Sequence, residues 1–196
     1  MEKTTKLLGG WGYVALIAGG FLGLFLGPFS GIVTLGGLVC VLIAFLRAGN
    51  ELNLPSIKRD ILIAIVLNVI AYVLFIFIVG AAVMALVLHS RHSGDLDTGA
   101  AAAFGVGTIL AGLIGWVLTI IGSWYWYKAS QALTDGTGVG TYRTGGLLIF
   151  IGSIAIIVFG LGALVIWIGE IIQAVAFFST QEESRDSLEP PGASAG

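Results

Sequence analysis

The sequence predicts an all-α fold, a polytopic membrane helix bundle with six spans. Of its 196 residues, 57% are hydrophobic and 10% are charged, whereas soluble domains carry about 25% charged residues. A bilayer core is about 30 Å thick, so ~20 apolar residues suffice to cross it. Four longer runs carry no Asp, Glu, Lys or Arg apart from Glu170 in the last: 7–46, 61–88, 98–127 and 144–181. We therefore expect a single transmembrane domain over residues 1–179 and no separate soluble domain.

The first and last runs are each about twice as long as one crossing requires. As one helix, residues 7–46 would extend about 60 Å at ~1.5 Å per residue. Gly27-Pro28 interrupts the first run, and Gly160-Leu161-Gly162 interrupts the last. Because glycine accepts the backbone angles of a tight turn and proline ends a helix, both runs are interpreted as hairpins. The predicted spans are about 8–26, 29–46, 61–88, 99–127, 144–160 and 162–179.

The nine Lys and Arg residues decide between six spans and four. Short cytoplasmic loops collect Lys and Arg. With six spans, eight of the nine fall on one side of the membrane and only Arg91 on the other. With four spans, in which the first and last runs are long tilted helices, the same residues divide four against five. The charges therefore favour six spans in the plasma membrane with both termini cytoplasmic, followed by a disordered tail over 180–196.

Two segments near the ends of the chain resemble a known family. The first is Leu8-Gly9-Gly10-Trp11-Gly12 with Ala18-Gly19-Gly20, and the second is TGVGTYRTGGLL at 137–148, running on to Ala176-Phe177-Phe178-Ser179. Both are similar to a largely archaeal integral membrane family, domain of unknown function 996. The resemblance covers nearly the whole chain except the tail, although the middle helices match only in being apolar. It implies no catalytic or ligand residues, because the family has none assigned, and it favours an archaeal plasma membrane.

Small residues form stripes along two of the predicted helices. Gly19, Gly23 and Gly27 are spaced by four on one face of the first helix. The comparable stripe on the fourth helix consists of Thr108, Gly112, Gly115, Thr119 and Gly122. In lipid no hydrophobic force drives helices together, so small residues that allow close backbone approach take over this role. We expect both stripes to pack helices within the bundle, and a homodimer face is the alternative.

Glu170 is the only formal charge inside a predicted span. A bare carboxylate near the bilayer centre is costly, so it should be protonated, paired or facing water. Gln173 lies one turn away on the same side, and the polar candidates to meet the two are Asn68, Thr119 and Ser123. One interpretation is a proton or cation relay. The other interpretation is structural: Glu170 is either a neutral, hydrogen-bonded acid that joins helices or an acid close enough to the interface to reach water. We favour the structural interpretation because no second ionisable residue lies within a span.

The predicted external loop contains the string His89, His92, Asp95 and Asp97. Imidazole and carboxylate groups could hold a divalent metal, but a solvated loop explains the same residues, and we predict no metal site.

Residues 136–140 lack the Gly-Lys-Ser/Thr ending of a phosphate loop. The net charge of −2 predicts no nucleic-acid partner, since that would need clustered Lys and Arg.

Aromatic residues gather near the predicted cytoplasmic ends of two helices. Trp124-Tyr125-Trp126-Tyr127 runs directly into Lys128, and Trp11 and Tyr13 lie near the start of the first helix. Trp and Tyr prefer the headgroup level of a membrane, so we interpret these residues as anchors. Binding of an aromatic or lipid-like ligand is the alternative.

The residue patterns favour a protein without catalytic activity. No Ser-His-Asp or Cys-His arrangement falls on one side of the predicted membrane, so we expect neither an enzyme nor a cofactor. The leading hypothesis is a structural or accessory subunit of a membrane assembly, whose partners are the lipid bilayer and either further copies or other membrane subunits. The alternative is a small transporter or channel that uses Glu170, and a membrane enzyme acting on lipid is the third hypothesis.

Overall fold

The computed structural model describes residues 1–26, 29–91, 98–156 and 161–180, and these residues form six helices and no strand. The predicted all-α helix bundle is thereby confirmed. The helices are α1 (Lys3–Leu26), α2 (Phe29–Glu51), α3 (Pro55–Arg91), α4 (Thr98–Thr137), α5 (Thr141–Ala155) and α6 (Leu161–Ser179).

Five of the described helices are long and apolar enough to cross a membrane, namely α1, α2, α3, α4 and α6. Helix α5 contains 15 residues, about 22 Å at ~1.5 Å per residue, and is not among them. The predicted span 144–160 coincides with α5 only in part, because residues 157–160 lie outside the described chain, as do 27–28 and the predicted tail from 181 onward. The number of crossings and the side of each terminus therefore stay predictions.

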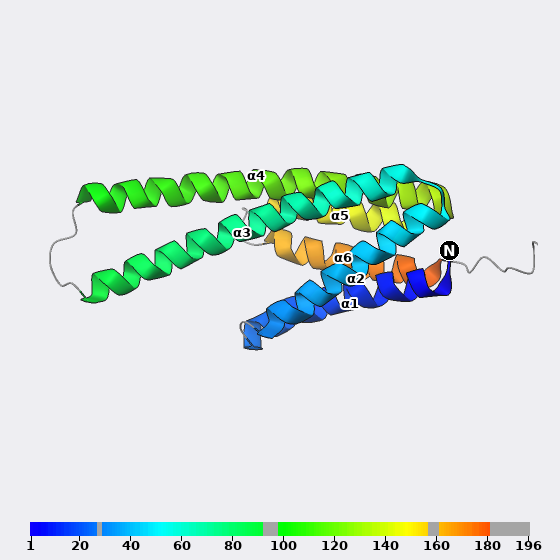
Figure 1. Cartoon of the computed structure of the whole chain (residues 1–196), viewed down its shortest axis with the longest axis horizontal. Helices are drawn as coiled ribbons and strands as arrows, with labels where there is room; N and C mark the ends of the chain where they lie inside the picture. The colour runs from blue at the N-terminus through cyan, green and yellow to red at the C-terminus, as the bar shows by residue number, and fades with distance from the viewer. Residues whose placement is uncertain (27–28, 92–97, 157–160, 181–196) are drawn as a thin grey trace, which may run out of the picture.

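Successive helices run in opposite directions and form three hairpins, α1–α2, α3–α4 and α5–α6 (Figure 1). The N-terminus, the α2–α3 turn, the α4–α5 turn and the end of α6 all lie at one end of the molecule, which we call the N-terminal end. In the two turns, Asn53 and Gly138 adopt positive φ angles of 53° and 73°, which asparagine and glycine tolerate better than other residues. The alternating directions thus return the chain to the end where it began.

In the α1–α2 and α5–α6 hairpins the two helices approach until their backbones touch. An ideal Cβ built on Gly37 of α2 would lie 2.8 Å from the carbonyl oxygen of Gly12 in α1. An ideal Cβ built on Gly152 of α5 would lie 2.7 Å from the carbonyl oxygen of Gly162 in α6. Real Cβ atoms essentially never come this close to another atom, so only glycine permits these two crossings.

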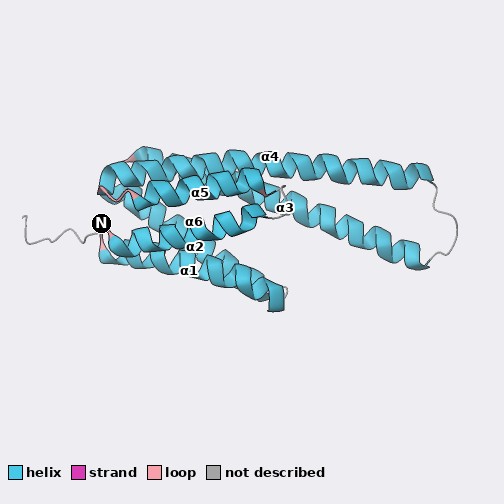
Figure 2. Ribbon diagram, turned by 180° about the vertical axis from the view of Figure 1, so that it is seen from behind, coloured by secondary structure: helices cyan, strands magenta, loops and turns pink. Residues whose placement is uncertain are grey.

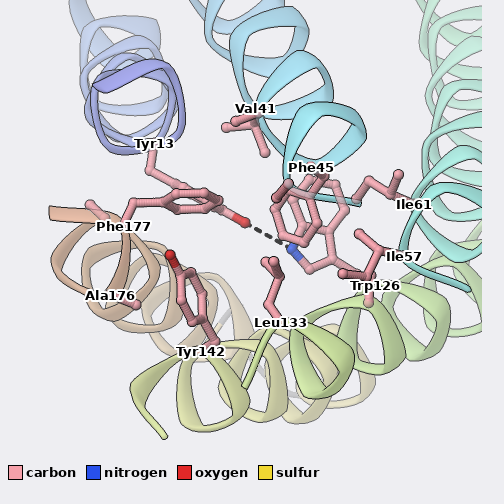
Figure 3. Close-up of a cluster of buried hydrophobic side chains, with 14 of the residues drawn as sticks. Tyr13, Val41, Phe45, Ile57, Ile61, Trp126, Leu133, Tyr142, Ala176 and Phe177 are labelled. Carbon is pink, nitrogen blue, oxygen red and sulfur yellow. Dashed lines mark hydrogen bonds between the residues drawn. The ribbon is translucent and has the colours of Figure 1, made fainter. Parts of the chain in front are cut away.

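The hydrophobic core lies at the N-terminal end, where side chains from all six helices meet (Figure 3). Aromatic and branched side chains fill it, and most of them are fully buried. Its large members are Tyr13 from α1, Val41 and Phe45 from α2, Ile57 and Ile61 from α3, Trp126 and Leu133 from α4, Tyr142 from α5 and Phe177 from α6.

Helices α3 and α4 contain 37 and 40 residues and extend past the other four (Figures 1 and 2). Near the end of α5, Trp116 of α4 donates a hydrogen bond from Nε1 to the Ser153 carbonyl, 3.0 Å away, and α5 ends at Ala155. At the same level, Gly115 of α4 faces Ala71 of α3. The α3–α4 hairpin continues beyond this level without the other helices.

We define the α3–α4 overhang as residues 72–91 of α3 and 98–115 of α4. At ~1.5 Å per residue, the α4 part of the overhang is about 27 Å long. The bundle therefore consists of a six-helix region that contains the core and a two-helix region that extends from it.

Candidate functional site

An aromatic cluster around Phe177 of α6 forms the centre of the core. The centroid of its ring lies 6.0 Å from that of Tyr13, 5.7 Å from that of Phe45 and 5.0 Å from that of Tyr142. Within this cluster Trp126 donates a hydrogen bond from Nε1 to the Tyr13 hydroxyl oxygen, 2.9 Å away (Figure 3). Both side chains are buried, so this bond joins α1 to α4 in a place that solvent does not reach.

Gln173 of α6 is the polar side chain that connects the most helices. Its Nε2 atom donates to the Ser130 hydroxyl oxygen on α4 at 2.8 Å and to the Tyr142 carbonyl oxygen on α5 at 3.0 Å. Ser130 in turn donates to the Trp126 carbonyl oxygen at 3.0 Å. The Gln173 side chain is fully buried, and its Oε1 atom has no hydrogen-bond partner among the described residues.

The Tyr142 hydroxyl joins the start of α5 to the end of α6. It lies 2.8 Å from the Thr180 hydroxyl, and Thr180 donates its own hydrogen to the Ala176 carbonyl oxygen at 2.9 Å. A threonine hydroxyl has one hydrogen to give, so Tyr142 is the donor to Thr180. This pair and the Gln173 amide together fix the α5–α6 hairpin against α4.

Glu170 lies one turn before Gln173 on α6 and is partly buried. It is close enough to the Tyr13 hydroxyl for an electrostatic interaction between the two groups. No described residue donates a hydrogen bond to its carboxyl group or forms an ion pair with it. The geometry therefore assigns the hydrogen bonds between helices to Gln173, whereas Glu170 lies at the edge of the same cluster without one.

The other polar residues expected near Glu170 are placed elsewhere. Asn68 donates from Nδ2 to the Ala64 carbonyl oxygen of its own helix at 2.8 Å, and its amide packs against Gly122 of α4. In the described part of the chain, no Cα atom of α3 lies within 8 Å of a Cα atom of α6. Thr119 and Ser123 likewise donate to carbonyl oxygens within α4. The structure thus brings Gln173 and Glu170 together and leaves Asn68 with α4.

The glycines of the two predicted stripes have different surroundings. Gly19 faces Thr34 and Gly23 faces Ser30, both across the α1–α2 contact, and Gly27 lies outside the described residues. On α4, an ideal Cβ on Gly115 would be 3.8 Å from the Ala71 carbonyl oxygen. No described atom of another element lies within 4 Å of an ideal Cβ on Gly112. The α1 stripe therefore packs a helix inside the bundle, and the α4 stripe becomes open at Gly112.

The string His89, His92, Asp95 and Asp97 falls almost wholly outside the described residues, which resume at Thr98 after Arg91. Among the residues that the structure does describe, no group of three or more His, Cys, Asp and Glu side chains could hold a metal ion. The expectation of a solvated loop accordingly stays a prediction.

The aromatic anchors need a correction, because three of them lie in the interior. Tyr13, Trp126 and Tyr127 are buried, whereas Trp124 and Tyr125 lie against the Lys128 ammonium, whose nitrogen is 5.6 Å and 5.3 Å from their ring centroids. The anchor interpretation missed that adjacent residues of a helix point about 100° apart, so a run of four aromatics cannot all face the membrane surface.

A helical spacing could have identified the inner face of α4. Trp126, Ser130 and Leu133 are separated by four and then three residues, the spacing of one helix face, and all three are buried. The partners of this face include Tyr13, which accepts a hydrogen bond from Trp126, and Gln173, which donates one to Ser130. They lie far apart in the sequence, and no local pattern predicts their contact.

The described chain is a helix bundle with five helices able to cross a membrane, which is the architecture expected of a multi-pass membrane protein. The protein belongs to the family described as protein of unknown function (DUF996), whose family model matches residues 33–171. It is 32% identical over 181 residues to the uncharacterized protein MJ1644 of Methanocaldococcus jannaschii, a match that covers 92% of this chain and 94% of the relative. No solved structure matches the chain. The resemblance predicted from the terminal segments is thereby confirmed.

Proposed function

We propose that this protein is a multi-pass integral membrane protein with a structural or accessory role in a membrane assembly. The observation that carries the proposal is the use of its buried polar side chains. The Trp126–Tyr13 bond joins α4 to α1, and the Gln173 amide joins α6 to α4 and α5. Hydrogen bonds between helices stabilise bundles in lipid. Polar groups that are occupied in this way favour a role in holding helices together.

The composition of α1 after Tyr13 and of α6 before Glu170 also supports this role. Residues 14–26 of α1, after Tyr13, contain no Ser, Thr, Asn, Gln, His or charged residue. The same is true of residues 161–169 of α6, before Glu170. A transport route through the bilayer is usually marked by polar or ionisable groups that face a common path. These two stretches of α1 and α6 contain none of those polar or ionisable residues that could mark a transport route.

A small transporter or channel is the second candidate, and one observation favours it. Glu170 lies one turn from Gln173, whose Oε1 atom is buried without a partner among the described residues. A carboxyl group and a carbonyl oxygen are suitable ligands for a cation or a proton-carrying water. This candidate requires the Glu170 carboxyl group to bind and release a proton or a cation during transport.

The proposed membrane is an archaeal plasma membrane, with the N-terminal end of the bundle in the cytoplasm. The basic residues at this end of the described chain are Lys3, Lys6, Arg47, Lys58, Arg59, Lys128 and Arg143, and only Arg91 ends a helix at the other. The positive-inside rule places the basic end in the cytoplasm. The archaeal source of the relative supports the choice of membrane.

Purification of the native protein in a mild detergent tests the structural role. We expect a defined assembly in which the protein is recovered with constant stoichiometry.

Flux measurements on reconstituted liposomes test the second candidate with Glu170→Gln, and with Asp135→Asn as a control at an exposed acid outside the core. A proton or cation flux that disappears in Glu170→Gln and persists in Asp135→Asn would contradict the structural role.

A further inference from the structure

An open groove lies along one face of α1 at the N-terminal end of the bundle. It is lined by five residues of α1 and one of α2, namely Lys3, Thr4, Leu7, Leu8, Trp11 and Cys40. The α1 residues follow one another at separations of three and four, which place them on one helix face. The volume of the groove is about 360 Å³, within the range of about 300–1,000 Å³ that is typical of small-molecule sites. The groove is therefore large enough for a segment of a lipid.

The two ends of the groove differ in polarity. Lys3 and Thr4 are exposed and form the polar end. At the apolar end, an ideal Cβ built on Gly12 would lie 3.1 Å from the Cβ atom of Cys40, so Cys40 lies at the level of Trp11. From Lys3 to Trp11 helix α1 rises about 12 Å at ~1.5 Å per residue. The groove thus offers a cation at one end and apolar walls over the rest of its length.

Trp11 is held in its place beside the groove by a contact with α6. Its ring meets the Phe178 ring edge to face, with the centroids 6.1 Å apart and the planes at 82°. Phe178 can approach α1 because Gly10 has no side chain, since an ideal Cβ on Gly10 would collide with the Phe178 ring. Trp11 nevertheless stays 63% exposed. The Gly-Trp pair of the first sequence motif therefore fixes the tryptophan ring without burying it.

Lys3 is the one charged residue among the six that line the groove, and no described residue forms an ion pair with it. The acids nearest to it along α1 and α2 already accept hydrogen bonds. Glu51 accepts one from the Thr5 hydroxyl and one from the Glu2 backbone nitrogen. The Glu2 carboxylate accepts one from the Thr4 hydroxyl at 3.4 Å. The Lys3 ammonium is therefore available to an anion at the polar end of the groove.

A bilayer would give the two ends of the groove different surroundings. Residues 7–26 of α1 carry no charge and extend about 30 Å at ~1.5 Å per residue, which equals the thickness of a bilayer core of about 30 Å. Lys3 then lies at the level of the headgroups, and Leu7 and Trp11 lie inside the edge of the hydrocarbon. Tryptophan is enriched at this boundary. A molecule with an anionic headgroup and a hydrocarbon chain matches both ends, whereas a soluble anion matches only one.

We propose that this groove binds one phospholipid of net negative charge, with the headgroup phosphate against the Lys3 ammonium and a hydrocarbon chain along Leu7 and Leu8 to Trp11. Anionic lipids gather at Lys and Arg next to the membrane surface, and basic pockets between membrane helices bind their headgroups. A zwitterionic lipid brings its own cation to Lys3 and so lacks this charge complementarity. The inference rests on the proposed membrane placement, but on neither the structural nor the transport role.

Alkylation of Cys40 measures whether the groove is occupied. Cys40 is the single cysteine of the chain and is partly exposed in the groove, so its thiol reports on the groove without any substitution. The full chain is reconstituted in liposomes of phosphatidylcholine, with or without phosphatidylglycerol, and treated with a small maleimide. We expect alkylation to be about fivefold slower with phosphatidylglycerol, the change that corresponds to a preference of ~1 kcal/mol for the anionic lipid. Equal rates would overturn the inference, and so would equal slowing by inorganic phosphate in phosphatidylcholine alone.

Three variants test whether the slowing depends on the charge in the groove. Lys3→Gln should abolish it and Lys3→Arg should keep it, because arginine restores the cation. Arg47→Gln is the control, since Arg47 is exposed at the same end of the bundle but does not line the groove. Slowing that persists in Lys3→Gln, or that disappears equally in Arg47→Gln, would contradict the proposed site.

Alkaline extraction of the liposomes separates this inference from the membrane placement on which it rests. We expect the parent and all three variants to stay with the lipid. Protein that is washed off would contradict the membrane placement itself. Protein that stays inserted but shows the same alkylation rate in both kinds of liposome would overturn the lipid site alone.

Discussion

Helix α4 passes through both regions of the molecule, and its two halves differ in what surrounds them. Near the N-terminal end, Trp126 and Leu133 are buried by side chains from the other five helices. In the overhang, Val106 and Ile109 of the same helix are exposed. Lys128, Gln131 and Asp135 all lie in the packed half, so hydrophobicity alone does not predict which half is packed. The difference comes from the number of helices that reach each level, and it determines where a substitution affects folding.

Glycine shows the same contrast between the two regions. Gly152 and Gly162 bring α5 and α6 into backbone contact, whereas Gly112 in the overhang has free space around it. The same residue type thus fixes a crossing in one region and leaves an open surface in the other. Paired substitutions, one in each region, can therefore test the comparison.

The largest effect is expected for truncation of Phe177. Phe177→Ala should lower the free energy of unfolding by about 3–5 kcal/mol, because it removes a fully buried ring from the centre of the aromatic cluster. Phe77→Ala in the overhang should change it by no more than about 0.5 kcal/mol when the protein is monomeric. Denaturation in detergent micelles followed by circular dichroism measures both. Comparable losses in the two variants would mean that the two regions do not differ in packing.

A smaller loss is expected when a side chain is introduced at the α5–α6 crossing. Gly162→Leu should lower the free energy of unfolding by about 1–3 kcal/mol or prevent folding, because the new Cβ collides with the backbone of α5. Gly112→Leu should leave the monomer within about 0.5 kcal/mol of the parent. The thermal transitions of the two purified variants give the comparison, and a parent-like transition for Gly162→Leu would show that the crossing is not tight.

Removal of the Trp126–Tyr13 hydrogen bond should have a still smaller effect. Trp126→Phe and Tyr13→Phe should each lower the free energy of unfolding by about 1 kcal/mol through the lost hydrogen bond, and Trp126→Phe should lose packing in addition. A double-mutant cycle should show a coupling energy of about 0.6 kcal/mol or more. The cycle uses unfolding free energies of the two single variants and the double variant. Strict additivity would argue against the bond.

The smallest effect is expected at Glu170. Glu170→Gln and Glu170→Leu should both stay within about 0.5 kcal/mol of the parent, because no described residue forms a hydrogen bond with the carboxyl group. Gln173→Leu is the contrasting variant and should cost about 1 kcal/mol, since it removes the hydrogen bonds that the amide donates to Ser130 and to the Tyr142 carbonyl oxygen. Thermal unfolding in the same detergent tests all three. A larger loss for Glu170→Leu than for Gln173→Leu would exchange the roles of the two residues.

Several parts of the fold could be predicted from the sequence because they depend on local composition. Charge-free runs and the Gly27-Pro28 break predicted the helices, and helix α2 begins at Phe29 as expected. The lengths of α3 and α4 were underestimated, since both helices continue through polar residues at their ends, α3 from Pro55 and α4 to Thr137. Apolar runs mark what lipid can cover, whereas a helix continues as long as its backbone hydrogen bonds do.

The candidate site was predicted less completely. Gln173 was identified from its spacing to Glu170, because i and i+3 residues share a helix face. Its actual partners, Ser130 and Tyr142, lie on other helices, and no spacing within one segment predicts them. The place of Asn68 against Gly122 was missed for the same reason, since the order in which helices neighbour one another is a property of the assembled bundle.

We propose that all six helices cross one membrane and that the N-terminal end of the bundle lies in the cytoplasm. Reporter fusions after Ala48, after Asp135 and in the tail, together with one after Gly94, test it most directly. We expect the first three to report a cytoplasmic location and the fusion after Gly94 to report the outside. Fusions after Ala48 and Asp135 that report the outside would contradict six spans. A tail that lies outside while Ala48 is cytoplasmic would contradict them too, because α5 would then not cross the membrane.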